Sequence, residues 1–174
     1  FDKYNLIATR GFLGAAYPYG NYPVTPLERV YYAGGANGIR AWPVRRLGPG
    51  SNISSDSLKI DQSGDIKLEA NLEYRFKFFW MLEGALFVDA GNVWAINRDD
   101  NRDGAVFQFN RFYKEIAVGS GVGLRLVTNY FILRTDVGIK LRDPSMPEGA
   151  RWIPGNRLYQ WSDLNFNIAI GYPF

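Results

Sequence analysis

The sequence predicts an all-β protein: the C-terminal portion of an antiparallel transmembrane β-barrel, contributing about six strands. Three observations support this fold class. Segments of strictly alternating polarity recur along the 174 residues, short and long connections alternate between them, and aromatic residues gather at their ends. The mean hydropathy of −0.21 agrees with interleaved polar and apolar residues, and no apolar stretch approaches the ~18 residues that a transmembrane helix needs.

The strongest strand prediction covers residues 65–78. Every even position there is apolar or aromatic: Ile66, Leu68, Ala70, Leu72, Tyr74, Phe76 and Phe78. Every odd position is polar: Asp65, Lys67, Glu69, Asn71, Glu73, Arg75 and Lys77. Because a strand directs alternate side chains to opposite faces, one face is apolar and the other carries the charges.

Further strands are predicted on both sides of this segment. They cover residues 6–17, where the alternation is weaker, and residues 82–91, 116–126, 131–142 and 164–174. The connections are tight near residues 79–81 and 128–129 and long at residues 18–63, 95–112 and 143–163. Outer-membrane barrels alternate short periplasmic turns with longer external loops in the same way, so we assign the long connections to the outside.

The apolar faces indicate contact with lipid rather than a soluble core. In each strand the apolar face continues over about 10 residues, the span of a tilted transmembrane strand. Aromatic residues at the strand ends resemble an interfacial girdle: Tyr74, Phe76, Phe78, Phe79, Trp80, Tyr130, Phe131, Tyr172 and Phe174. The alternative is a soluble or lipocalin-like barrel, in which the apolar face points inward and the charges meet water.

Six strands are too few to close a membrane barrel. Single-chain bacterial barrels begin at about eight strands, and an open edge in lipid leaves backbone groups without hydrogen bonds. Phe1 also opens directly into a strand-like pattern. We therefore expect residues 1–174 to be the C-terminal segment of a larger barrel, of about sixteen strands, whose first strands lie upstream.

The composition excludes several classes of function. The chain has no cysteine and no histidine, which removes thiolate chemistry, the commonest metal ligand and the commonest general base. We expect no enzyme activity, no metal and no cofactor. The net charge of +3 comes from mixed signs along the chain, without the basic stripe of a nucleic-acid-binding protein.

One short segment resembles the start of a calcium loop. Residues 99–104 read Asp-Asp-Asn-Arg-Asp-Gly, with acidic residues at alternate positions and a glycine at the sixth. The twelfth position is Asn110 rather than a bidentate glutamate, and no flanking helices are predicted. A solvated external loop is the default interpretation.

The long connection at residues 18–63 holds the most specific sequence. It contains Tyr-Tyr-Ala-Gly-Gly-Ala-Asn-Gly-Ile-Arg-Ala-Trp at residues 31–42, followed by Leu-Gly-Pro-Gly at residues 47–50. Connections of about 45 residues are far longer than ordinary loops and are usually functional or disordered. The glycines and aromatics favour a folded structure, and the plain alternative is a surface Ω-loop.

A pair of acidic residues suggests what this loop does. The hairpin around Trp80 places Glu73 opposite or diagonal to Asp89 inside the barrel, where two carboxylates repel each other unless a cation lies between them. Arg40 could supply a guanidinium that bridges both. The alternative is a basic residue of the wall itself. The candidates are Arg75, Lys77 and Arg125.

These residues resemble the BamA/TamA family of outer-membrane protein assembly factors, also known as the bacterial surface antigen family, and look most like its TamL-type branch. The family has an aromatic-x-Gly-Gly stretch, a Val-Arg-Gly-Phe-like tetrapeptide and Gly-Pro in a long external loop. The matching residues here include Gly34, Gly35, Ile39, Arg40, Ala41, Trp42, Gly48 and Pro49, with Glu73 and Asp89 as the hairpin acids. Ala41 replaces the usual glycine and Trp42 the usual phenylalanine, which leaves the packing of the loop open.

The end of the chain resembles the strand signal by which outer-membrane barrels are recognised for assembly. Its apolar residues alternate up to a terminal aromatic: Leu164, Phe166, Ile168, Ile170, Tyr172 and Phe174. An ordinary edge strand would explain the alternation but not the terminal aromatic. Pro173 lacks an amide donor and limits pairing at this end.

The resemblance implies a function in the assembly and insertion of outer-membrane proteins, in the outer membrane and without covalent chemistry. The implied partners are outer-membrane lipids, client outer-membrane proteins, and upstream barrel strands and periplasmic POTRA-type domains that this chain lacks. Two alternatives remain open, an outer-membrane translocation pore and a passive structural or adhesive barrel. If the chain functions in assembly, the Arg40 loop would brace the wall while a weak lateral seam opens.

Overall fold

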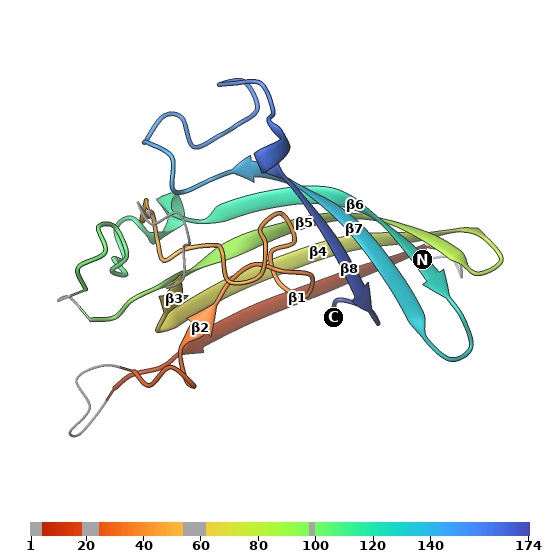
Figure 1. Cartoon of the computed structure of the whole chain (residues 1–174), viewed down its shortest axis with the longest axis horizontal. Helices are drawn as coiled ribbons and strands as arrows, with labels where there is room; N and C mark the ends of the chain where they lie inside the picture. Colours follow the sequence, from red (N-terminus) through yellow and green to blue (C-terminus); the bar gives the residue numbers. More distant parts are fainter. Residues whose placement is uncertain (1–4, 19–24, 54–61, 98–99) are drawn as a thin grey trace.

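The computed structural model describes residues 5–18, 25–53, 62–97 and 100–174. One antiparallel sheet with the order β1-β4-β5-β6-β7-β8 forms the body of the molecule (Figure 1). Its strands are β1 (Asn5–Ala15), β4 (Ile66–Phe79), β5 (Leu82–Trp94), β6 (Ala117–Val127), β7 (Ile132–Arg142) and β8 (Leu164–Ile170). The short strands β2 (Tyr31–Tyr32) and β3 (Ser63–Gly64) form a separate pair inside the longest connection.

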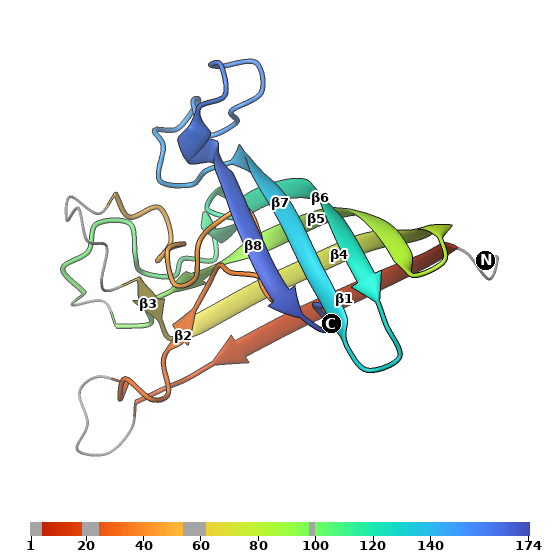
Figure 2. The same ribbon diagram turned by 45° about the vertical axis from the view of Figure 1, so that its right-hand side comes forward.

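The sheet curves strongly, so that β7 and β8 cross in front of the central strands in both views (Figures 1 and 2). Each strand pairs with its neighbour in the sheet, and β1 and β8 form its two edges, so the barrel is not closed by the six strands. Two single-turn 3-10 helices, η1 (Phe112–Lys114) and η2 (Trp161–Asp163), precede β6 and β8. Within the described residues, no helix has the length and apolar character to span a membrane.

The burial of the strands is the reverse of that in a soluble barrel. In β4, Glu69 and Glu73 are completely or almost completely buried, whereas Leu72 and Tyr74 are 49% and 38% exposed. The same order holds in β7, where Arg134 and Asp136 are fully buried. Charged side chains therefore line the concave interior and apolar ones face outward, which confirms the transmembrane fold class and rules out the soluble alternative.

The tight connections lie at one end of the sheet and the long ones at the other. Trp80, with φ of 48°, and Met81 connect β4 to β5, while Thr128 closes the β6–β7 turn by accepting hydrogen bonds from Tyr130 and Phe131. Parts of the longest connection and Asp99 lie outside the described residues.

The structure corrects the sequence prediction at the end of β8. The alternation of residues 164–174 predicted a strand through Phe174, but β8 ends at Ile170. Gly171 adopts φ of 88°, a conformation that a side chain disfavours, and it turns the last residues out of the sheet. Tyr172 and Phe174 consequently do not continue the outward-facing row.

A second correction concerns Arg142. The alternation of β7 placed it on the polar face with Lys140, but the pairing shifts by one residue between Val118 and Gly119. Lys140 lies opposite Gly119, whereas Arg142 lies opposite Val118. Directly opposed residues share a face of the sheet, so this bulge turns Arg142 to the outward side.

Candidate functional site

The glycine- and aromatic-rich motif of the longest connection folds back into the concave side of the sheet. Its apolar residues are buried and pack with two residues of the wall: Ala33, Ile39, Ala41, Trp42 and Leu47 with Val93 and Ala117. Gly34 and Gly35, with φ of 99° and 90°, turn the chain, and the Gly35 amide donates to the Trp42 carbonyl at 2.8 Å. Residues 31–47 of this connection thus form a folded unit on the concave side of the sheet rather than an external Ω-loop.

Arg40 lies at the tip of this unit and is completely buried between two acids of the wall. Its Nε donates to Asp89 Oδ2 at 2.8 Å and its Nη2 to Asp89 Oδ1 at 2.9 Å, a bidentate pair. Its Nη1 contacts Glu73 Oε2, and its backbone amide donates to Asp89 Oδ2 at 3.1 Å. The guanidinium carbon also lies 3.6 Å from the centre of the Phe87 ring.

Two effects act on the protonation of Arg40. Burial lowers the pKa of its guanidinium, but the hydrogen bonds and charges of Asp89 and Glu73 outweigh burial and raise the pKa above its ordinary value. Arg40 is therefore a cation, and its positive charge offsets the repulsion between the two carboxylates and allows them to lie close together. Register explains the geometry, because Asn71 lies opposite Asp89 and Glu73 opposite Phe87, so the two acids are diagonal.

The basic residues of the wall contribute as well. Arg75 Nε lies 2.6 Å from Glu73 Oε1 and Arg125 Nη2 lies 2.9 Å from Glu73 Oε2, while Lys77 is exposed. Asp89 accepts from Arg40 and from the side-chain amide of Asn71, at 2.9 Å. The structure therefore brings together Arg40 and two of the three wall cations around Glu73.

The loop is also held by β8, a contact that the sequence reasoning missed. The side-chain amides of Asn165 and Asn167 each donate to the Arg40 carbonyl at 2.9 Å. Arg134 Nη2 donates to Asn37 Oδ1 at 2.7 Å from β7. One residue of the loop is thus connected by its side chain to β4 and β5 and by its carbonyl to the last strand.

Glycines of the wall make room for the loop, and these too were missed as site residues. A side chain at Gly138 would place its Cβ 2.6 Å from the Arg40 carbonyl oxygen and 2.8 Å from the backbone of Ala41. Gly119 faces the Ala41 methyl group in the same way. The signal was present in the sequence as glycines in the polar phase of the strands. These glycines also explain how the loop can have Ala41 where the resemblance led us to expect a glycine, because they leave room for the Ala41 methyl group.

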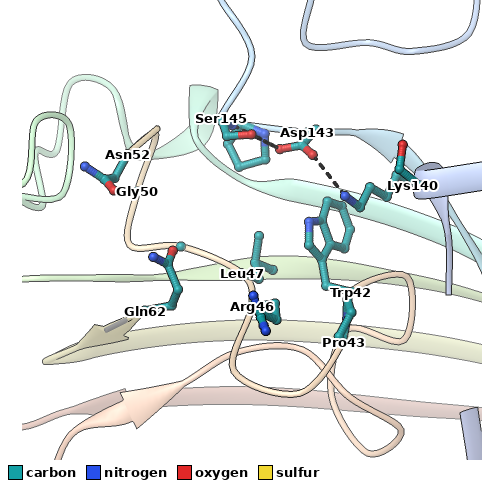
Figure 3. A pocket seen from close by; sticks show the side chains of 13 residues that line it. Trp42, Pro43, Arg46, Leu47, Gly50, Asn52, Gln62, Lys140, Asp143 and Ser145 are labelled. Carbon is teal, nitrogen blue, oxygen red and sulfur yellow. Dashed lines mark hydrogen bonds and ion pairs between the residues drawn. The ribbon is translucent and has the colours of Figure 1, made fainter. Parts of the chain in front are cut away.

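A cavity of about 340 Å³ lies beside Trp42, between the loop and the outer end of β7 (Figure 3). Lys140 Nζ lies 5.3 Å from the centre of the Trp42 ring and 3.4 Å from Asp143 Oδ2. Asp143 also accepts from the Ser145 hydroxyl at 2.7 Å. Trp42 therefore packs under a cation of the wall.

In the described part of the calcium-like segment, the Arg102 side chain supplies the positive charge that faces Asp100. Asp99 lies outside the described residues, and Asp100 Oδ2 accepts from Arg102 Nη2 at 2.6 Å. Among residues 5–18, 25–53, 62–97 and 100–174, no group of three or more acidic, histidine or cysteine side chains could hold a metal ion.

The residues of the predicted C-terminal signal divide into two groups. Phe166, Ile168 and Ile170 face outward and are 62%, 65% and 78% exposed. Beyond Gly171, the Tyr172 ring lies 4.2 Å from the Arg75 guanidinium carbon, and the Phe174 carbonyl accepts from Arg75 Nη2 at 3.3 Å. The last residues therefore return to the interior charge cluster.

Comparison with known proteins agrees with this architecture. The crystal structure of BamA from Haemophilus ducreyi lacking POTRA domains 1–3 is similar, with a TM-score of 0.62 and 20% identity over 95% of this chain. The chain spans 31% of the length of that BamA chain. No curated protein matches the sequence. The profile of the Omp85 superfamily domain matches residues 1–174, and the chain therefore belongs to the Omp85 superfamily.

Proposed function

We propose that this chain is the C-terminal part of an outer-membrane barrel that assembles and inserts other outer-membrane proteins, without covalent chemistry. The observation that carries the proposal is the loop fixed in the barrel interior by Arg40. Its buried bonds to Asp89 and Glu73 connect the loop to β5 and β4, and its carbonyl is connected to β8. A brace of this kind can keep the braced strands in register while another part of the wall opens.

The free edge at β8 is the place where the wall can open, although β8 itself is also connected to Arg40. β4 has 14 residues and pairs along its whole length with β5, whereas β8 has 7 residues and lies at an edge of the sheet. In our proposal, upstream strands of the full protein pair weakly with β8. Opening of this seam exposes backbone groups with which a strand of a client protein can pair, and the Arg40 brace keeps the rest of the wall in register.

The same proposal covers localisation and partners. The exposed apolar faces of β4 to β8 would lie in the lipid of the outer membrane, with the long connections outside. Client outer-membrane proteins and periplasmic POTRA-type domains are the proposed partners.

The test is replacement of Arg40 by alanine in the full-length protein. We expect loss of assembly of other outer-membrane proteins, measured as the fraction of a reporter barrel that becomes heat-modifiable after depletion of the wild-type protein. Arg46→Ala is the matched control, because this exposed arginine of the same loop has no role in the brace. Normal assembly by the Arg40→Ala protein, at wild-type abundance, would refute the proposal.

A conductance measurement separates the main alternative. A translocation pore should give large, steady channels in planar bilayers with the full-length wild-type protein. The assembly proposal expects small or flickering conductance, because the folded loop occupies the interior, and it expects larger conductance in the Arg40→Ala protein. Large steady channels in the wild type would favour transport.

A further inference from the structure

A cluster of cations lies at the outer end of β6 and β7, away from the Arg40 site. The bulge in β7 turns Arg142 outward, opposite Val118. Arg142 and Trp152 form an isolated β-bridge that brings the last long connection beside the strand end. η1 supplies the third side, so that Lys114 approaches the same place.

Two guanidinium groups share one acceptor in this cluster. Arg142 Nη2 and Arg151 Nη1 donate to the carbonyl oxygen of Lys114 at 2.5 and 2.6 Å. Lys114 Nζ lies 3.4 Å from Glu148 Oε1, in an ion pair whose members are 49% and 66% exposed. Of the three cations, Lys114 is paired with the exposed Glu148 carboxylate, whereas Arg142 also donates to the Ile116 carbonyl and Arg151 to the Met146 carbonyl. The two guanidinium groups are therefore held together by neutral backbone oxygens, and like charges this close repel each other, which favours a bound anion.

These side chains surround a cavity of about 320 Å³. Its lining consists of Lys114, Arg142, Glu148, Gly149, Arg151 and Trp152. Guanidinium groups match the paired oxygens of a phosphate, and the lysine adds a mobile point charge. The volume and the charge fit a phosphorylated group of small size.

The position of the cavity indicates a source for that group. Below it on the same outward side of the sheet lie the apolar residues of β6, of which Val122 and Leu124 are 55% and 44% exposed. Trp152 is 52% exposed and Tyr113 is 55% exposed, and the ring of Trp152 lies 5.8 Å from the Arg142 guanidinium carbon. An aromatic residue beside cations, directly above a lipid-facing wall, is the arrangement found at headgroup level.

We propose that this cavity binds the phosphate of a lipid headgroup in the outer leaflet. Arg142 and Arg151 hold the phosphate, Lys114 completes its neutralisation, and Trp152 lies at the boundary between headgroup and acyl chains. Glu148 competes with the phosphate for Lys114. The inference requires a barrel embedded in a membrane but not the assembly activity, so the two can fail separately.

The test is binding of defined lipids to the detergent-solubilised full-length protein, measured by native mass spectrometry. We expect phosphatidylglycerol to bind more tightly than phosphatidylcholine, whose phosphate is already paired with its own cation. Lys114→Gln should weaken binding of phosphatidylglycerol by about fivefold, the contribution of one cation near a charged surface. Glu148→Gln should strengthen it, because it removes the competing carboxylate.

The opposite signs of these two effects protect the test against misfolding, which could only weaken binding. Arg46→Gln, which removes one positive charge from another part of the outer end, is the control and should bind as wild type. Equal binding of the two lipids, or wild-type binding by both the Lys114→Gln and Glu148→Gln proteins, would overturn the proposal. Displacement of the lipid by equimolar inorganic phosphate would assign the site to a soluble anion instead.

Discussion

The interior around Arg40 and the C-terminal end of the chain are built in opposite ways. Arg40, Glu73 and Asp89 have no exposed surface and are connected by charge-assisted hydrogen bonds across three segments of the chain. β8 has 7 residues, and its outward side chains are largely exposed. After Gly171 the chain is held by Arg75 and by a 3.1 Å hydrogen bond from the Tyr172 hydroxyl to Glu83.

The contrast shows that this wall is fixed at one point and lightly held at another. Buried ionic contacts are costly to break because a lone charge is left in a low dielectric, whereas exposed ones contribute little. A large local difference in stability allows one element to move while the remainder keeps its register. Substitutions around Arg40 should therefore cost more stability than substitutions near the C-terminal end.

The largest effect is expected at Arg40. Its replacement by alanine leaves Asp89 with Asn71 and leaves Glu73 with Arg75 and Arg125. Loss of one partner from a buried ionic group costs about 3–5 kcal/mol, which equilibrium unfolding of the full-length protein in detergent micelles should reveal. A loss below ~1 kcal/mol would mean that the wall cations already suffice.

A double-mutant cycle sharpens this result. In an Asp89→Asn background, Arg40→Ala should cost less than in the wild type, because its bidentate acceptor has already lost its charge. The Arg46→Ala protein provides the reference for removal of an exposed arginine. Additive effects of the two substitutions would contradict a direct pair.

The second effect is expected at Gly138, where the loop approaches the wall. Alanine there would place Cβ 2.6 Å from the Arg40 carbonyl oxygen, so the loop must shift, at a cost of about 1–3 kcal/mol. Gly11→Ala in β1 is the matched control, since its Cβ would meet nothing within 4 Å. Equal unfolding midpoints for the two variants would show that the loop does not press on Gly138.

Periodicity predicted most of the strands because the polarity of a residue indicates which face of the sheet it occupies. It gives no information beyond that face. The alternation of residues 65–78 corresponds to β4, and the resemblance of the loop motif indicated that Arg40 belongs near Glu73 and Asp89. Contacts that depend on three-dimensional proximity did not follow from it. Asn165 and Asn167 read as ordinary interior polar residues, and nothing in their spacing connects them to the Arg40 carbonyl.

Two single-residue features also escaped the pattern. A bulge adds one residue to a strand and inverts the alternation beyond it, so Arg142 was assigned to the wrong face. At Gly171, continued alternation of Tyr172 and Phe174 suggested a strand, but a positive φ ended it. A bulge or a positive φ changes the backbone without changing the pattern of polar and apolar residues, so the pattern cannot predict it.

The third effect tests the light region through Gly171. Alanine there has no steric obstacle within 4 Å, but the φ of 88° disfavours a side chain by about 1–2 kcal/mol. We expect the last residues to leave Arg75, which hydrogen–deuterium exchange of residues 164–174 should report as faster exchange with little change in global unfolding. Gly149→Ala, with φ of 93° in the last long connection, carries the same strain as a control. Unchanged exchange in the Gly171→Ala protein would contradict a turn held by weak contacts.

The smallest effect is expected at Asp163, which ends η2 directly before β8. The hydrogen bonds from the Arg157 guanidinium, at 2.6 and 2.7 Å, lower the pKa of this carboxyl below its ordinary value, although burial opposes them. A group whose pKa is lowered by folding stabilises the fold fully above the unfolded value, about 3.9, and loses that contribution as the pH falls through the folded value. Exchange of residues 157–164, corrected for its intrinsic pH dependence, should therefore be constant from pH 8 to pH 5 and increase below about pH 4. The Asp163→Asn protein should show the fast exchange already at neutral pH, because its amide cannot accept both hydrogen bonds from Arg157. A wild-type exchange profile in that protein would mean that the start of β8 does not depend on this ion pair.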